Sequence, residues 1–127
     1  MVAQIAVLHP RDTAYFDEET LNTLSRDLGP SVAENIVCRA LEDLAVRLTQ
    51  IRTEYAEGDQ RALRKSVKSA IPILEQIGLP KMARVASDVL TCVDQGEGVA
   101  LAATLCRLLR CGEMAISCAE MGMDLSL

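Results

Sequence analysis

Aromatic side chains and histidine are nearly absent from this chain of 127 residues. It contains two tyrosines, one phenylalanine, no tryptophan and one histidine. Binding to bases or sugar rings relies on stacking against aromatic faces, so both classes of ligand are disfavoured. Half of the residues are nevertheless hydrophobic, and Leu, Ile, Val, Ala and Met must supply the core. The length suits one domain with a core of its own.

Basic residues are also in the minority. The chain has 13 Lys and Arg against 18 Asp and Glu, so its formal net charge is −5. Because this balance repels a phosphate backbone on average, we do not expect nucleic acid as a partner. No apolar run is long enough to cross a bilayer, and residues 1–12 lack the basic start of a secretion signal. We therefore expect a cytoplasmic protein with no membrane partner.

Motifs of catalysis and metal binding are missing. The sequence has no GxGxxG or Walker loop, no HExxH and no GxSxG. The five cysteines are an odd set without a CxxC pair, which in a reducing compartment predicts buried thiols rather than disulfides or zinc ligands. They are Cys38, Cys92, Cys106, Cys111 and Cys118. We expect no enzymatic activity, no cofactor and no metal.

The apolar residues recur at helical spacing along nearly the whole chain. Short stretches that contain Gly, Pro or Asp, typical of turns, divide this pattern into five segments. These predict helices over residues 17–28, 30–57, 59–76, 80–94 and 99–121. The predicted fold class is all-α, an antiparallel up-down four-helix bundle with a short N-terminal capping helix.

The predicted bundle occupies residues 16–122. An N-terminal arm of residues 1–15 precedes it, and a C-terminal tail of residues 123–127 follows it. Pro72 lies inside the third segment, where a proline removes one backbone hydrogen bond and crowds the preceding turn. We therefore expect a bend near residues 68–72.

One run of residues carries a more specific signal. GDQRALRKSVKS, residues 58–69, resembles the run that leads into the active histidine of histidine-containing phosphotransfer (Hpt) domains. That run typically reads Gly-Asp, two variable residues, Ala-Leu, and later Ala-His-Ser-Leu-Lys-Gly. Ile77-Gly78 stands where the family often has Leu-Gly or Ile-Gly, and residues 16–29 are similar to its short first helix. The resemblance covers about residues 16–118 and implies a bacterial two-component phosphorelay.

At the positions on which the family's chemistry depends, this chain has different residues. Lys68 stands in the place of the phospho-accepting histidine, Ile71 in that of a lysine and Pro72 in that of a glycine. A neutral imidazole offers a lone pair for attack on an acyl phosphate, whereas a lysine ammonium has none. A proline ring would also obstruct the close approach of the partner's aspartate. The resemblance thus implies binding to a receiver domain or sensor kinase without phosphate transfer.

Residues around the altered position form a predicted docking patch. They are Arg64, Lys68, Ser69, Ile71, Pro72 and Glu75. Two interpretations stay open: a contact surface that brings the Lys68 ammonium near a receiver's acidic pocket, or an ordinary solvated helix face. Ile71 either forms an apolar surface pair with Pro72, which would suggest a contact, or turns into the core.

Two other functions remain as alternatives. A homodimeric structural bundle without a phosphorelay role is reasonable, because the apolar residues 2–8 would reach over the bundle or across to a second chain. An active phosphotransferase with an unrecognised acceptor ranks last. Its one histidine, His9, lies beside Pro10 in the predicted arm, where no rigid helix would hold the ring for in-line attack.

Overall fold

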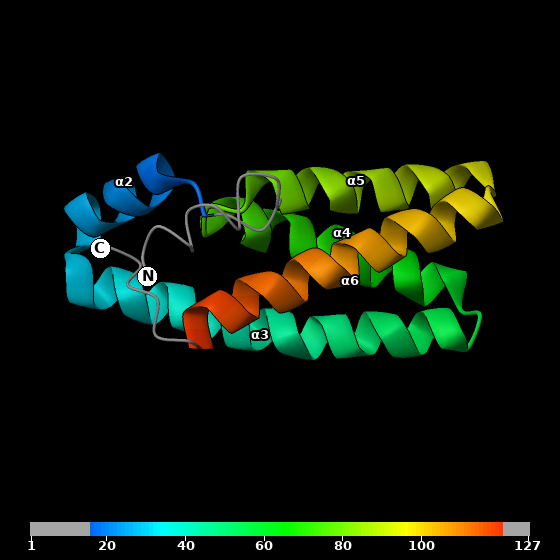
Figure 1. The fold of residues 1–127 in the computed structure, drawn as a ribbon, viewed down its shortest axis with the longest axis horizontal. Coiled ribbons are helices and arrows are strands. Elements are labelled where there is room, and N and C mark those ends of the chain that lie inside the picture. The colour runs from blue at the N-terminus through cyan, green and yellow to red at the C-terminus, as the bar shows by residue number, and fades with distance from the viewer. Residues whose placement is uncertain (1–15, 121–127) are drawn as a thin grey trace, which may run out of the picture.

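The computed structural model describes residues 16–120, and side chains within residues 16–118. This part of the chain is built from helices and contains no strand. The helices are α2 (Glu18–Leu28), α3 (Pro30–Ala56), α4 (Gln60–Gln76), α5 (Pro80–Gln95) and α6 (Gly98–Glu120) (Figure 1). The all-α prediction is confirmed for the described residues. The predicted arm with His9, and the predicted tail of residues 123–127, lie outside them.

Local capping explains where the helices begin and end. The Asp17 carboxylate accepts a hydrogen bond from the Thr20 N–H at 3.2 Å, and that of Asp59 accepts one from the Ala62 N–H at 3.1 Å. Each satisfies an amide that the first helical turn leaves without a backbone partner. Gly96 ends α5 in the left-handed region, with φ of 68°. Because these signals are local, the observed bounds lie within one residue of those predicted.

The four longer helices lie alongside one another, and α2 lies at one end (Figure 1). Helix α3 packs against both α4 and α6, and α5 also packs against both of them. Helix α2 packs on α3, and the Asp17 N–H just before it donates to the Gly78 carbonyl at 2.6 Å. This hydrogen bond ties the start of α2 to the turn between α4 and α5.

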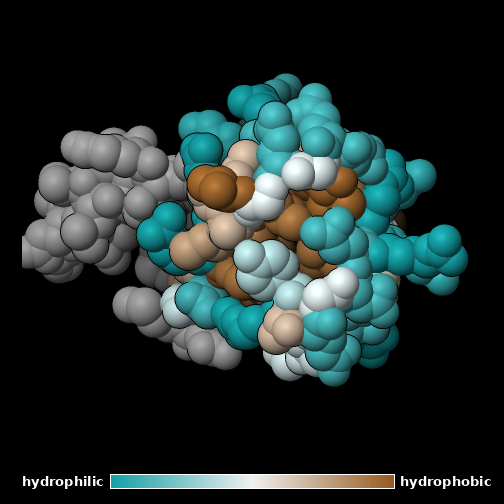
Figure 2. Space-filling view, turned by 90° about the vertical axis from the view of Figure 1, so that its right-hand side faces the viewer, coloured by the Kyte–Doolittle hydropathy of each residue, from teal (hydrophilic) through white to brown (hydrophobic). Residues whose placement is uncertain are grey.

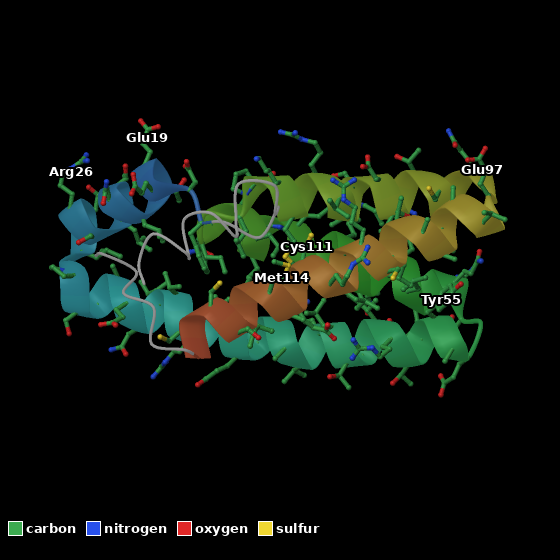
Figure 3. All side chains as sticks on the ribbon, in the orientation of Figure 1. Glu19, Arg26, Tyr55, Glu97, Cys111 and Met114 are labelled. Atoms are coloured by element: carbon green, nitrogen blue, oxygen red, sulfur yellow. The ribbon has the colours of Figure 1, made fainter. Side chains whose placement is uncertain are left out.

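The core consists of aliphatic side chains from all five helices. The largest side chains that are fully buried include Leu44, Ile51, Leu63, Leu74, Met82, Leu105 and Leu108. No polar or charged residue is fully buried among the described residues. The predicted apolar seams are therefore largely confirmed, although the seam along α3 ends before Tyr55, which is 41% exposed. Tyr55 and Glu97 both lie toward the end of the molecule opposite α2, at the ends of different helices (Figure 3).

The prediction that all five cysteines are buried is wrong for two of them. Cys92 and Cys111 are buried and Cys118 is half-buried, but Cys38 and Cys106 are exposed. Both exposed cysteines directly follow a buried core residue, and one step along a helix turns the next side chain by about 100°. The low polarity of the thiol did not override that geometry.

The end of the molecule opposite α2 exposes part of the apolar interior. Figure 2 views this end and shows hydrophobic side chains at its centre, surrounded by hydrophilic ones. Val99, at the start of α6, is 89% exposed. Within the part of the chain that the structure describes, no helix combines the length and apolar character needed to cross a bilayer.

Candidate functional site

Helix α4 turns an apolar face to the core and a basic face to solvent. Leu63, Val67, Ala70 and Leu74 make the buried face. Arg61, Arg64, Lys65 and Lys68 all lie on exposed or half-exposed positions within about two helical turns. Glu75 is the only acidic residue of this helix. An excess of positive charge is therefore concentrated on one helix of an acidic chain.

Lys68 is exposed on the outer face of α4. Its neighbours Val67 and Ala70 point into the core, so the helix itself directs Lys68 outward. No hydrogen bond or ion pair joins the Lys68 side chain to another described residue. The ammonium is thus exposed to solvent rather than turned into the protein.

Arg64 forms a bidentate ion pair with Asp94 of α5. The distances are 2.7 Å from Arg64 Nε to Asp94 Oδ1 and 3.0 Å from Nη2 to Oδ2. These hydrogen bonds hold the pKa of Asp94 below its ordinary value, and the charges of Arg64 and Lys68 act in the same direction, while desolvation opposes them. The same contact raises the pKa of Arg64. Both side chains remain substantially exposed.

Ser69 lies on the opposite flank of α4, facing α3. Its hydroxyl accepts a hydrogen bond from Arg47 Nη1 at 2.5 Å and donates one to the Ser66 carbonyl at 3.0 Å. Arg47 is in turn paired with Asp43 at 3.0 Å. Ser69, Arg47 and Lys65 help to line a groove of about 400 Å³ between α3 and α4. Ser69 is therefore engaged with α3 rather than grouped with Arg64.

Ile71 and Pro72, neighbours in the predicted patch, have different environments. Ile71 is half-buried and packs on the core, which favours core placement over an exposed apolar pair. Pro72 is exposed, and α4 continues through it as one helix. Because proline has no N–H, the Lys68 carbonyl lacks its usual helical donor. The predicted bend at this point stays a prediction.

Glu75 completes the predicted patch from farther along α4. It is exposed and lines a groove of about 320 Å³ against the first turns of α5, together with Arg84 and Ser87. Helical spacing puts Arg64, Lys68 and Glu75 on the same flank of α4. The six predicted residues thus do not form one cluster: three share the α5 flank, and Ser69 faces α3.

Sequence reasoning missed the residues that modify this surface. Asp94 lies 30 positions from Arg64, and no local pattern announces a pair between two helices. Arg61 and Lys65 were visible as charges on the same helix, and helical periodicity would have placed them beside Lys68. No group of three metal-binding side chains converges among the described residues.

No protein-family model, curated protein or solved structure was found to match this chain.

Proposed function

We propose that this chain is a degenerate Hpt-like interaction module of a bacterial two-component phosphorelay. It binds a receiver domain or a sensor kinase in the cytoplasm and does not transfer phosphate. The observation that carries the proposal is the exposed Lys68 ammonium on the outer face of α4, at the position that the register of residues 58–78 assigns to the phospho-accepting histidine. No enzymatic activity and no cofactor are part of this function.

The arrangement of the helices supports the proposal. Each of the four longer helices packs against two of the others, and short turns join them in sequence. Short connections favour reversal of direction between neighbours, which is the antiparallel up-down bundle that the resemblance implies. Helix α2 would then be the capping helix at one end (Figure 1).

The chemistry of the three substituted positions argues for binding without transfer. The Lys68 ammonium offers no lone pair to a phosphoryl group. Ile71 packs on the core and supplies no cation beside it, and the exposed Pro72 ring occupies the place where a glycine would admit a partner. What remains is a helix face with positive charge, suited to contact with an acidic partner.

Two measurements with a phosphorylated receiver from the same genome test this function. The chain should bind the receiver and remain unlabelled by its phosphoryl group. Lys68→Glu should weaken binding, whereas Lys81→Glu, which makes the same charge change at an exposed position on α5, should have a smaller effect. An acid-labile label on the wild-type chain would overturn the inactive assignment, and absence of binding to every receiver and kinase would overturn the docking function.

A structural homodimer is the second candidate, favoured by the outer face of the first two turns of α6. Val99, Ala102, Ala103 and Cys106 are all exposed there, and none carries a charge. A second copy packing on this face would bury it. Light scattering would then give the mass of a dimer, and Ala103→Glu would reduce it to that of a monomer. A wild-type monomer at micromolar concentration would exclude this candidate.

A further inference from the structure

The cations on α4 differ in whether the protein itself neutralises them. Arg61, Lys65 and Lys68 form no ion pair with another residue of the described part of the chain, whereas Arg64 is paired with Asp94. The four side chains lie on one helix surface, so a partner that contacts Lys68 also meets its neighbours one turn away. Asp94 is therefore a negative charge set at the edge of a positive surface.

We infer that the outer face of α4 docks on an acidic surface of a protein partner through Arg61, Lys65 and Lys68, and that Asp94 limits the strength of this docking by holding Arg64. The inference rests on the proposed function and adds the chemistry of the partner and a residue that tunes affinity. The surface is basic on a chain of net charge −5, so charge complementarity selects an acidic partner over other surfaces of similar shape.

The geometry of the ion pair explains how Asp94 acts. Arg64 directs Nε and Nη2 to the two carboxylate oxygens, which occupies one edge of its planar guanidinium. A carboxylate on the partner must compete with Asp94 for that edge. Because Asp94 is about half exposed, it also meets an incoming acidic surface as a like charge beside Lys68. Both effects reduce affinity.

Protein fits this surface better than nucleic acid. Acidic residues flank the positive charge of α4: Asp94 on α5 pairs with Arg64, and Glu54 on α3 lines a groove with Lys65. Asp43 on α3 pairs with the Arg47 that contacts Ser69. A phosphate backbone would run past these carboxylates, and the described residues offer few aromatic side chains for stacking. A compact acidic pocket can contact the cations of α4 without crossing the flanks.

A pair of charge-matched variants tests the inference. Asp94→Asn and Asp88→Asn each remove one negative charge from α5, but Asp88 has no hydrogen bond or ion pair to a described residue. We expect Asp94→Asn to tighten binding to the receiver by about two- to fivefold, the scale of an exposed ion pair. Asp88→Asn should produce a clearly smaller gain. Equal gains for the two variants, or weaker binding by Asp94→Asn, would overturn the role of Asp94.

A background variant separates release of Arg64 from simple loss of charge. In Arg64→Gln, the additional change Asp94→Asn should bring a smaller gain in affinity than in the wild type, because the like-charge repulsion is still relieved but no guanidinium is left to release. Circular dichroism of each variant establishes that the helices are intact. A gain in affinity as large as that in the wild-type background would overturn the inference but would not affect the proposed docking function. Absence of wild-type binding to any receiver or kinase, or preferential binding to DNA, would instead reject the proposed function itself.

Discussion

Gly112 of α6 lies directly against Leu48 of α3. A Cβ atom added to Gly112 would overlap Cδ1 of Leu48 and would lie 3.0 Å from Cε of Met82. Gly112 is buried, and Leu48 and Met82 belong to the core. The absent side chain thus allows α6 to approach α3 and α5 closely at this point, in the middle of the packed helices.

Gly112→Ala should destabilise the protein even though alanine is the better helix former. Alanine gains about 1 kcal/mol in helix propensity over glycine. The methyl group would meet the side-chain ends of Leu48 and Met82, which must repack within the core at a cost of about 1–3 kcal/mol, so we expect a small net loss, at most about 2 kcal/mol, in the free energy of unfolding. Urea denaturation measures it. Gly98→Ala is the control, since a Cβ there meets nothing within 4 Å, and it should not lower stability. A more stable Gly112→Ala would show that Leu48 moves aside freely.

Pro72→Ala should stabilise the protein. The substitution restores an N–H that can donate to the Lys68 carbonyl, in a helix that already continues through this position. A gain of about 1–3 kcal/mol in the free energy of unfolding follows from the helix preferences of the two residues. Pro80→Ala is the matched control, because Pro80 opens α5, where the missing N–H costs nothing. If both variants gave the same change in the free energy of unfolding, the cost assigned to the missing N–H of Pro72 would not exist.

Local signals explain why the helices could be predicted so closely from the sequence. Asp17 and Asp59 cap helices through contacts three residues away, and Gly96 ends a helix through its own backbone angle. Exposure near the ends and on the outer faces was predicted less well. Tyr55 continues the spacing of the α3 seam but extends past the packed core, and Cys106 has an apolar side chain on an outward position. Whether such a side chain is buried or exposed depends on how the neighbouring helices pack.

The candidate site was predictable only in part. The helix predicted over residues 59–76 includes Lys68, and helical periodicity is enough to show that Lys68 shares a flank with Arg64. The partners of this surface come from other helices: Asp94 of α5 holds Arg64, and Arg47 of α3 holds Ser69. Contacts between residues 22 or 30 positions apart depend on how the helices are rotated against each other, which no local pattern specifies.

The Asp94 carboxyl should titrate below its ordinary pKa of 3.8. Hydrogen bonds from Arg64 favour the ionised form, with a further contribution from the charges of Arg64 and Lys68. Because the folded-state pKa is lowered, the associated stability is present above pH 3.8 and is lost as the pH falls through the lower value. NMR titration of the side-chain carboxyl carbon gives the pKa directly. Arg64→Gln should raise it, whereas Arg84→Gln, also on an exposed side chain, should leave it nearly unchanged. A wild-type value at or above 3.8 would contradict the ion pair.

Under the proposed function, introducing the three residues of the Hpt pattern should convert the chain into a phosphoryl acceptor. The variant Lys68→His, Ile71→Lys, Pro72→Gly places an imidazole lone pair on the exposed face of α4, with a cation and an open approach beside it. Incubated with an acyl-phosphate receiver, the variant should take up acid-labile label, as the phosphoryl group leaves the aspartate oxygen and bonds to the ring nitrogen. Glycine is also less harmful than proline inside a helix, so α4 should persist.

The control for this conversion is Lys65→His, which puts the same ring on an exposed position of α4 outside the family register. It should stay unlabelled, because transfer requires the nitrogen to be held in line with the partner's phosphoryl group and not merely to be accessible. Equal labelling of both variants would mean that the alignment of residues 58–78 with the Hpt pattern does not identify the position of phosphoryl transfer. A triple variant that keeps its helices and binds the receiver, yet takes up no label, would show that the surface around Lys68 no longer presents position 68 to the partner's aspartate.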